Sequence, residues 1–323
     1  MTDPALARVA DRLAALRDAI DQVSDGVDRA IIRDGVRDVL DRDAATPTDA
    51  PLIANSFTGL ERLHRGASFE ILLVRQRDLG TLYALKTLCP ERGSAPLLRR
   101  LLLDEARHQE RVRHPACLAL RAALRLADGR PALLLDYVDA PTLATVLRER
   151  HLGSVECIAL ALRLAAALEA VHAAGLIHGD VSPANVLLPG GRAEAAILLD
   201  FGLARCIGAR PHEADLEQAW TPGFAAPEAR SPGAPADVTS DLFSLGRLLA
   251  VACVPDARAE LEPLLGSLLQ TNPSDRPQSA RETIGLLATC GAKDTTHAKT
   301  AATSSNESVS RLMKSSGRVI SRL

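Results

Sequence analysis

The chain has 323 residues, 47% of them hydrophobic, which is enough for about two domains with a sizeable core. A formal net charge of -2 argues against a nucleic-acid or membrane partner recruited by bulk charge. The six cysteines lie scattered without a CxxC pair, so we expect neither a zinc site nor a disulfide framework, and a reducing cytoplasm is the simplest setting. Acidic side chains among the first residues predict no signal peptide. Charges interrupt the most apolar stretch, 157–177, which predicts a buried helix rather than a membrane span.

Residues 1–46 are predicted to form a helical extension. Its apolar side chains recur at alternating spacings of three and four, the heptad pattern of a coiled-coil seam. They are Leu6, Val9, Leu13, Leu16, Ile20, Val23 and Val27. Two interpretations stay open. One is a dimerising or regulatory helix, which in the dimerising case would make the protein a homodimer, and the other is a helix laid against the chain's own folded part. Residues 47–56, which include Pro47 and Pro51, are predicted to be a linker.

Residues 58–90 contain strand-like runs around a turn at Asp78 to Gly80, and a third run ends at Lys86. Lys86 is the single lysine among the first 292 residues. Almost everywhere else that this part of the chain has a basic side chain, the side chain is arginine. The ammonium group is a compact point charge that a guanidinium does not reproduce. Lys86 is therefore a candidate for chemistry.

Three further elements follow in the chain. Residues 94–113 predict an amphipathic helix that carries Glu105, and residues 132–139 include an apolar strand. Residues 154–174 predict a long helix that ends at Gly175, a residue type common at helix ends. This helix leads directly to the stretch of the sequence that is richest in candidate chemistry.

Polar side chains mark the stretch from His178 to Gly202, at Asp180, Asn185 and Asp200. Short apolar runs precede the last two and are separated by a Pro-Gly-Gly turn, which predicts a hairpin that brings Asn185 and Asp200 together. One amide and one carboxylate suit a divalent metal such as magnesium, which takes few protein ligands. Asp180 would lie beside that metal and accept a proton from a hydroxyl that attacks a phosphate.

This stretch resembles the catalytic loop and metal-binding turn of protein kinases, whose usual forms are HRDLKxxN and DFG. Further on, TPGFAAPE (221–228), SDLFSLG (240–246) and NPSDRP (272–277) resemble other motifs of that family, in the same order. The resemblance implies an α+β, two-lobed fold, with a small β-rich N-lobe at about 57–135 and a larger helical C-lobe at about 139–290. The C-terminal residues 291–323 are predicted from their composition to form a disordered tail.

The resemblance also implies a role for each matching residue. Lys86 and Glu105 would form a pair that fixes the α- and β-phosphates of ATP, Gly66 would lie in the glycine loop over them, and Asp180 would be the catalytic base. Leu135 would be the gatekeeper, with the backbone of Asp136 and Val138 meeting the adenine. Asn185 and Asp200 would hold Mg²⁺ or Mn²⁺. The residues with implied structural roles are His178, Phe201, Gly202, Thr221, the pair Glu228 and Arg276, and Asp241, which would brace the catalytic loop.

The chain departs from the family pattern at several positions. His64 and Phe69 stand where the outer glycines of the loop belong, and a Cβ atom there restricts the approach of backbone N–H groups to phosphates. Ser182 replaces a lysine directed at the γ-phosphate, and Gly179 replaces the arginine that receives an activating phosphate in many kinases. Thr221 is the only hydroxyl between 203 and 225, so we predict activity that is independent of phosphorylation of the activation segment.

The region 250–261 leaves little room for the helix that often docks protein substrates. The tail is rich in Ser and Thr and has more basic than acidic side chains. It is interpreted as a carrier of autophosphorylation sites, as a weak docking segment for a partner or an acidic membrane surface, or as inert.

Three functions follow from these observations. The first is a cytoplasmic serine/threonine protein kinase similar to the eukaryotic-like kinases of bacteria, dependent on ATP and magnesium, with a protein substrate of unknown identity. The second is a small-molecule phosphotransferase of the aminoglycoside type, because HGD followed by AN also resembles its loop. The third is a pseudokinase scaffold, which His64, Phe69 and Ser182 favour and the presence of Lys86 and Asp180 opposes.

Overall fold

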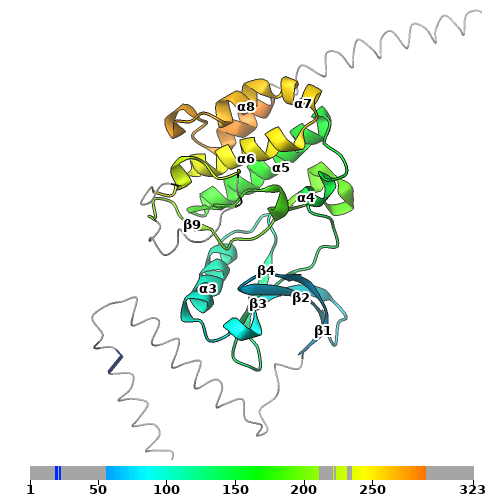
Figure 1. Ribbon diagram of the computed structural model, residues 1–323, viewed down its shortest axis with the longest axis vertical. Helices are drawn as coiled ribbons and strands as arrows, with labels where there is room; N and C mark the ends of the chain where they lie inside the picture. Colours follow the sequence, from blue (N-terminus) through cyan, green and yellow to red (C-terminus); the bar gives the residue numbers. More distant parts are fainter. Residues whose placement is uncertain are drawn as a thin grey trace, which may run out of the picture. The chain divides into compact units, whose positions relative to one another are not determined.

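A computed structural model describes residues 19–20, 22, 56–210, 221, 223–230 and 235–288 (Figure 1). The described chain forms two compact units. The first contains residues 56–111 and 119–137, and the second contains 112–118 together with the described residues from 138 onwards. The sheet-rich first unit and helical second unit agree with the predicted α+β fold. The predicted helical extension, linker and tail lie outside the described residues, apart from Ala19, Ile20, Gln22 and Ser56.

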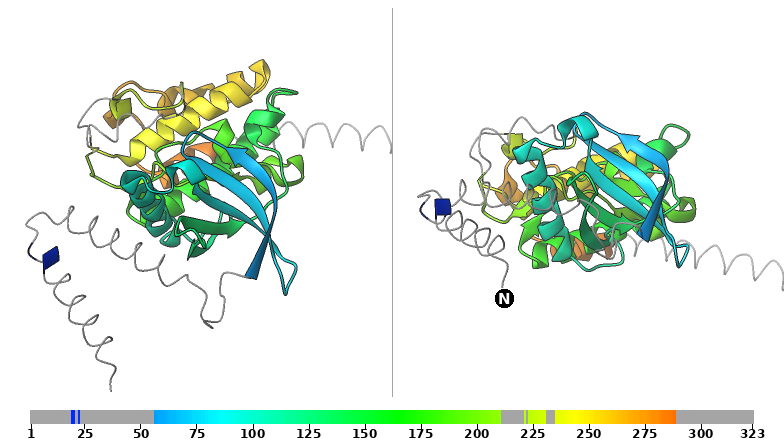
Figure 2. Two further views of the ribbon diagram at one scale, coloured as in Figure 1. Left: turned by 60° about the horizontal axis from the view of Figure 1, so that its bottom comes forward. Right: turned by 90° about the horizontal axis from the view of Figure 1, so that it is seen from below.

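The first unit is built on an antiparallel sheet of five strands in the order β1-β2-β3-β5-β4. The strands are β1 (Phe57–Arg65), β2 (Phe69–Gln76), β3 (Leu82–Leu88), β4 (Leu120–Arg125) and β5 (Pro131–Asp136). A 3-10 turn, Pro90–Arg92, follows β3 and leads to helix α3 (Pro96–Glu110), which packs on β3, β4 and β5 (Figure 2). The turn predicted at 78–80 joins β2 to β3, and the strand that carries Lys86 continues two residues further than predicted.

The register of the sheet decides which face each side chain occupies. Val74, Leu85, Ala132 and Leu134 form the buried cluster of one face, because side chains alternate along a strand. Lys86 pairs with Ile71 on β2 and with Leu133 on β5, so these three side chains share the opposite face. The single lysine of this part of the chain is thus placed on the face opposite that buried cluster.

The second unit is mainly helical, with α4 (Leu143–Val146), α5 (Ser154–Ala173), α6 (Val238–Ala252), α7 (Pro255–Glu260) and α8 (Glu262–Leu268). Its short 3-10 turns are Pro183–Asn185, Pro189–Gly191, Ala193–Ala195, Glu228–Arg230 and Pro273–Asp275. Two short antiparallel pairs complete it: β6 (Leu176–Ile177) with β9 (Arg205–Cys206), and β7 (Val186–Leu187) with β8 (Ile197–Leu198). The six-residue helix α7 lies in the region that the sequence predicted to leave little room for the helix that often docks protein substrates.

Helix α5 is the centre of the second unit's core and packs against α6 (Figure 1). Leu160, Leu164 and Leu168 recur at helical spacing and are fully buried, as predicted for this apolar stretch. The helix is followed by Gly175 with φ of 73°, a left-handed conformation that favours glycine. Among the described residues, no helix combines the length and apolar character needed to cross a membrane.

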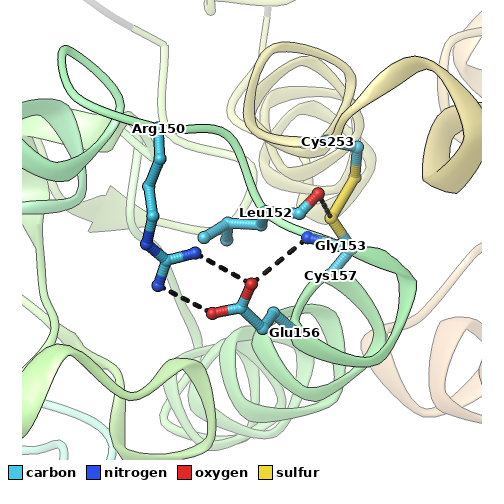
Figure 3. Close-up of a disulfide and its surroundings, with 6 residues drawn as sticks. All are labelled: Arg150, Leu152, Gly153, Glu156, Cys157 and Cys253. Carbon is cyan, nitrogen blue, oxygen red and sulfur yellow. Dashed lines mark hydrogen bonds and ion pairs between the residues drawn. A yellow bond between two sulfur atoms is a disulfide. The ribbon is translucent and has the colours of Figure 1, made fainter.

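The start of α5 is fixed by a charged pair. Glu156 accepts hydrogen bonds from the backbone N–H of Gly153 (3.2 Å) and from Arg150 (2.8 and 2.9 Å), as Figure 3 shows. The hydrogen bond from Arg150 is the main reason why the pKa of Glu156 lies below its usual value. An acidic side chain in the first turn also suits the positive end of the helix dipole.

A disulfide joins Cys157 on α5 to Cys253, directly after α6 (Figure 3). The Cα atoms are 6.1 Å apart, within the usual range for a disulfide. Backbone hydrogen bonds hold the same two segments together, from Leu152 N–H to the Ala252 carbonyl (2.8 Å) and from Val254 N–H to the Leu152 carbonyl (2.9 Å). The expectation that the cysteines form no disulfide was therefore wrong for this pair. The two cysteines are 96 residues apart in the sequence, and no local sequence pattern predicts such a pairing.

Candidate functional site

In the first unit, Lys86 and Glu105 form a buried ion pair. The Nζ atom of Lys86 lies 2.7 Å from Oε1 of Glu105, and the two side chains are only 10% and 4% exposed. Strand β3 presents the lysine and α3 the glutamate. The pair was predicted only through the family resemblance. Because both side chains are buried, each charge stabilises the other, and removing one of them would cost folding free energy.

The turn between β1 and β2 contains Gly66, the predicted glycine of a phosphate-binding loop. Gly66 N–H donates to the Phe69 carbonyl (2.8 Å), and the backbone N–H of Cys89 donates to the Ser68 carbonyl (2.9 Å). The Cys89 thiol, which is fully buried, also donates to the Gly66 carbonyl (3.6 Å). These contacts attach the turn to the end of β3.

The two departures in this loop lie on the face of the sheet that carries Lys86. His64 pairs with Ile71, which is also the partner of Lys86. Phe69 lies two residues before Ile71 on β2, and its ring centroid is 5.7 Å from the Lys86 Nζ atom. Side chains thus occupy this face where the family pattern has glycine.

The end of β5 contains the predicted gatekeeper, Leu135, which is buried and pairs with Ala84. Asp136 follows at the edge of the first unit, and its N–H donates to the Ala119 carbonyl (3.1 Å). Its carboxylate receives two hydrogen bonds from Arg121 (2.5 and 2.7 Å), a partner that the sequence analysis missed. Val138, the other predicted adenine contact, belongs to the second unit.

In the second unit, Asp180 is held from two directions. The amide nitrogen of Asn185 donates to Oδ2 of Asp180 (2.7 Å) and to its carbonyl (3.0 Å). The backbone N–H of Thr221 donates to Oδ1 (3.2 Å). The Thr221 hydroxyl donates to the hydroxyl of Ser182 (3.3 Å), which is fully buried. Ser182, which stands where the family has a lysine, therefore connects the loop of Asp180 to Thr221.

The predicted hairpin is present and joins Asn185 to the segment that carries Asp200. Strands β7 and β8 pair, and Leu199 N–H donates to the Asn185 carbonyl (2.8 Å). Asp200 has φ of 60°, and its Oδ1 accepts the N–H of Gly202 (3.0 Å). Phe201 between them is fully buried.

The donor set fits a magnesium or manganese ion. Asn185 directs its amide nitrogen to Asp180, so the amide oxygen is the atom left for a metal, and Asp200 adds a carboxylate. Among the described residues there is no group of three or more His, Cys, Asp or Glu side chains that could hold a metal ion. A metal here would complete its shell with oxygens from outside the protein, as Mg²⁺ does when it binds phosphates and water.

Asp241 on α6 organises the start of the loop. Its carboxylate accepts N–H groups from His178 (2.8 Å) and Gly179 (2.9 Å) and from the His172 ring (2.9 Å). Burial alone would raise the pKa of Asp241, but the hydrogen bonds and charge of His172, the charge of His178 and the N–H of Gly179 together lower it. The partner His172, on α5, is the residue that the sequence analysis missed here.

His178 and Gly179 have further contacts. The His178 ring donates to the Leu199 carbonyl (2.9 Å), and its centroid lies 5.2 Å from that of Phe201 in an edge-to-face arrangement. Gly179 has φ of 81°, and a Cβ atom there would lie 2.6 Å from the Leu203 carbonyl oxygen. A larger residue at this position therefore requires the segment around Leu203 to shift.

The predicted pair of Glu228 and Arg276 is brought together. Arg276 donates two hydrogen bonds to Glu228 (2.6 and 2.9 Å), and its side chain is completely buried. The remaining guanidinium hydrogens reach the carbonyls of Thr239, Gln270 and Thr271 (3.1, 2.7 and 3.1 Å). Every direction of the guanidinium fork is thus used to fix the segment around Glu228.

Comparisons with known proteins agree with this geometry. The profile described as "Protein kinase domain" matches residues 57–257. The serine/threonine-protein kinase PknK of Mycobacterium tuberculosis is 33% identical over 223 residues, which are 68% of this chain and 19% of that protein. Serine/threonine-protein kinase pkn2 of Myxococcus xanthus is 29% identical over 277 residues, 74% of this chain and 33% of that protein.

Solved structures are also similar to this chain. The crystal structure of the M. tuberculosis PknI kinase domain has a TM-score of 0.57 and 26% identity, and covers 76% of this chain and 100% of that domain. The chain spans about a fifth to a third of the length of the two kinases named above. Because the profile matches most of the sequence and the fold is shared, the chain belongs to the protein kinase family.

Proposed function

We propose that the protein is a serine/threonine protein kinase that uses ATP and a divalent metal. One observation carries this proposal: the carboxylate of Asp180 is held by the Asn185 amide and the Thr221 N–H, beside the hairpin that joins Asn185 to the segment of Asp200. A scaffold has no need for a carboxylate in this fixed position. The names of PknK and pkn2 support serine or threonine as the acceptor.

In the proposed reaction, Asp180 orients the hydroxyl of a serine or threonine and accepts its proton. The hydroxyl oxygen forms a bond to the γ-phosphorus while the bond to the leaving ADP oxygen breaks. The positioned base contributes about 10²–10⁴-fold to the rate. Asn185 and Asp200 would hold Mg²⁺ or Mn²⁺, which when bound offsets negative charge on the phosphates. Lys86, fixed by Glu105, would hold the α- and β-phosphates.

The remaining predicted residues are proposed to position these groups. Asp241 fixes the backbone of His178 and Gly179, and Arg276 fixes Glu228. The latter pair favours a protein substrate over an aminoglycoside-type small molecule, since it belongs to the peptide-binding lobe of protein kinases. Gly66, Leu135, Asp136 and Val138 stay proposed nucleotide contacts.

The independence from activation-segment phosphorylation also stays a proposal, since residues 211–220 and 222 are outside the described chain. Two contacts support it: the Thr221 hydroxyl already donates to Ser182, and the Thr221 N–H donates to Asp180. Phosphatase-treated protein should therefore retain its activity. A stoichiometric phosphate on Thr221 that raises the activity would contradict this. A homodimer, docking by the tail and a cytoplasmic location remain predictions as well.

The proposed function is tested by acceptor profiling. The purified chain is incubated with Mg-ATP and a peptide library containing Ser, Thr or Tyr acceptors, beside a panel of aminoglycosides, and the products are identified by mass spectrometry. We expect phosphate on Ser or Thr, and none when EDTA removes the metal. Phosphate found only on an aminoglycoside would show that the substrate is a small molecule and not a protein. No transfer to any acceptor, with no binding of ATP, would favour a scaffold.

A further inference from the structure

The ammonium of Lys86 lies near two electron-rich groups. The Glu105 carboxylate oxygen is 2.7 Å from Nζ, and the centroid of the Phe69 ring is 5.7 Å from it. The second distance is within the range at which a cation interacts with an aromatic face. Lys86 retains only 8% of its surface exposed. An anion that approaches this ammonium therefore meets a charge that is already partly satisfied.

The position of the Phe69 side chain follows from the sheet register and not from a loop conformation alone. Phe69 opens β2 and pairs with Leu88 on β3, and Ile71, two residues further, pairs with Lys86. Side chains two residues apart on a strand share a face. The Phe69 carbonyl also accepts the Gly66 N–H (2.8 Å), which holds the strand end against the turn. The backbone pairing of Phe69 with β3 and its hydrogen bond with Gly66 thus hold the Phe69 ring over Lys86.

We propose that Phe69 is a specificity-determining residue of the phosphate site, whose ring lowers the affinity of Lys86 for the phosphates of a nucleotide. This rests on the proposed function, in which Lys86 binds those phosphates. The physical reason is electrostatic and steric. The negative face of the ring competes with a phosphate for the ammonium and repels the phosphate itself. The Cβ atom and ring also occupy the position from which a glycine would let the backbone approach the anion.

The test compares the affinities of the full chain for ATP and for adenosine by calorimetry, in the wild type and in Phe69→Gly and Phe69→Leu. Adenosine lacks the phosphates, so it reports on the rest of the nucleotide site. We expect Phe69→Gly to bind ATP about two- to fivefold more tightly, the range that corresponds to losing one cation–π contact, with unchanged adenosine affinity. Phe69→Leu keeps the bulk and removes the aromatic face, so a smaller gain is expected.

Phe57 provides a matched control. Its ring contacts Tyr83 (centroids 6.1 Å apart) and packs with the cluster on the face opposite Lys86. Phe57→Leu should leave the ATP affinity unchanged. Thermal unfolding without nucleotide checks that each variant is folded. Should Phe69→Gly fail to fold, Phe69→Leu decides the question by the same criterion.

The outcomes separate this inference from the proposed function. Tighter ATP binding by the Phe69 variants alone supports the inference. Binding of ATP by the wild type with equal or weaker binding by the Phe69 variants overturns it and leaves the proposed function intact. If neither the wild type nor any variant binds ATP, both fail.

Discussion

At the scale of single residues, Asp241 illustrates how a buried carboxylate supports the loop that contains Asp180. It is 1% exposed and accepts two backbone N–H groups and one imidazole N–H. Asp241→Asn would point an amide N–H at one of these donors, so at least one buried donor loses its acceptor. We expect a loss of about 2–4 kcal/mol in the free energy of unfolding at pH 7, measured by urea denaturation.

The lowered pKa of Asp241 gives this prediction a pH dependence. A carboxylate whose pKa is lower in the folded state contributes stability above its unfolded pKa of about 3.9, and this contribution is lost as the pH falls through the folded value. The stability difference between wild type and Asp241→Asn should therefore be full near pH 7 and shrink below about pH 4. A difference that stays constant down to pH 3 would contradict the assigned cause.

A second prediction concerns the buried ion pair of Lys86 and Glu105, in which each charge neutralises the other. Glu105→Ala should cost about 3–5 kcal/mol of folding stability, since it removes the carboxylate that lies 2.7 Å from the buried Lys86 ammonium. The double variant Lys86→Met with Glu105→Leu should be more stable than Glu105→Ala alone, because it removes both charges. Denaturant unfolding of both variants measures the difference. A double variant less stable than Glu105→Ala would show that packing, and not charge, dominates this contact.

At the scale of elements, the disulfide between Cys157 and Cys253 links α5 to the end of α6 across 96 residues of sequence. Closing a loop of this length restricts the unfolded chain, which suggests a contribution of about 2–4 kcal/mol. Cys253→Ser should lower the unfolding midpoint, and dithiothreitol should lower the wild type to a similar level without further effect on the variant. Cys206→Ser, at an exposed cysteine, is the control and should respond to dithiothreitol like the wild type. Equal stability of oxidised and reduced wild type would contradict the prediction.

Elements of this fold differ in how far the sequence could predict them. The hairpin of β7 and β8 and helix α5 were predictable, because their apolar runs, glycines and prolines act locally. The pairing of Lys86 with Glu105 came only through the family motifs. The contacts of Asp241 with His172 and of Cys157 with Cys253 could not be predicted, since the partners are 69 and 96 residues apart and meet only when α5 packs against α6.

At the scale of the whole molecule, the proposed machinery is divided between the two units. The first unit contains Lys86 and Glu105, the proposed phosphate anchor, and the second contains Asp180 with the proposed metal ligands Asn185 and Asp200. Neither unit contains the full set. Loss of Lys86 and loss of the Asp180 carboxylate should therefore slow transfer for different reasons. Loss of Lys86 should weaken nucleotide binding, whereas loss of the Asp180 carboxylate should leave binding in place.

The rate of phosphate transfer by Asp180→Asn, beside the wild type and Lys86→Met, tests the central claim most directly. Asparagine has nearly the same shape and can still accept one of the hydrogen bonds from Asn185 and Thr221, so the fold should be kept. We predict a rate about 10²–10⁴-fold below the wild type with unchanged ATP affinity, and weakened ATP binding in Lys86→Met. Transfer by Asp180→Asn at the wild-type rate would contradict the account.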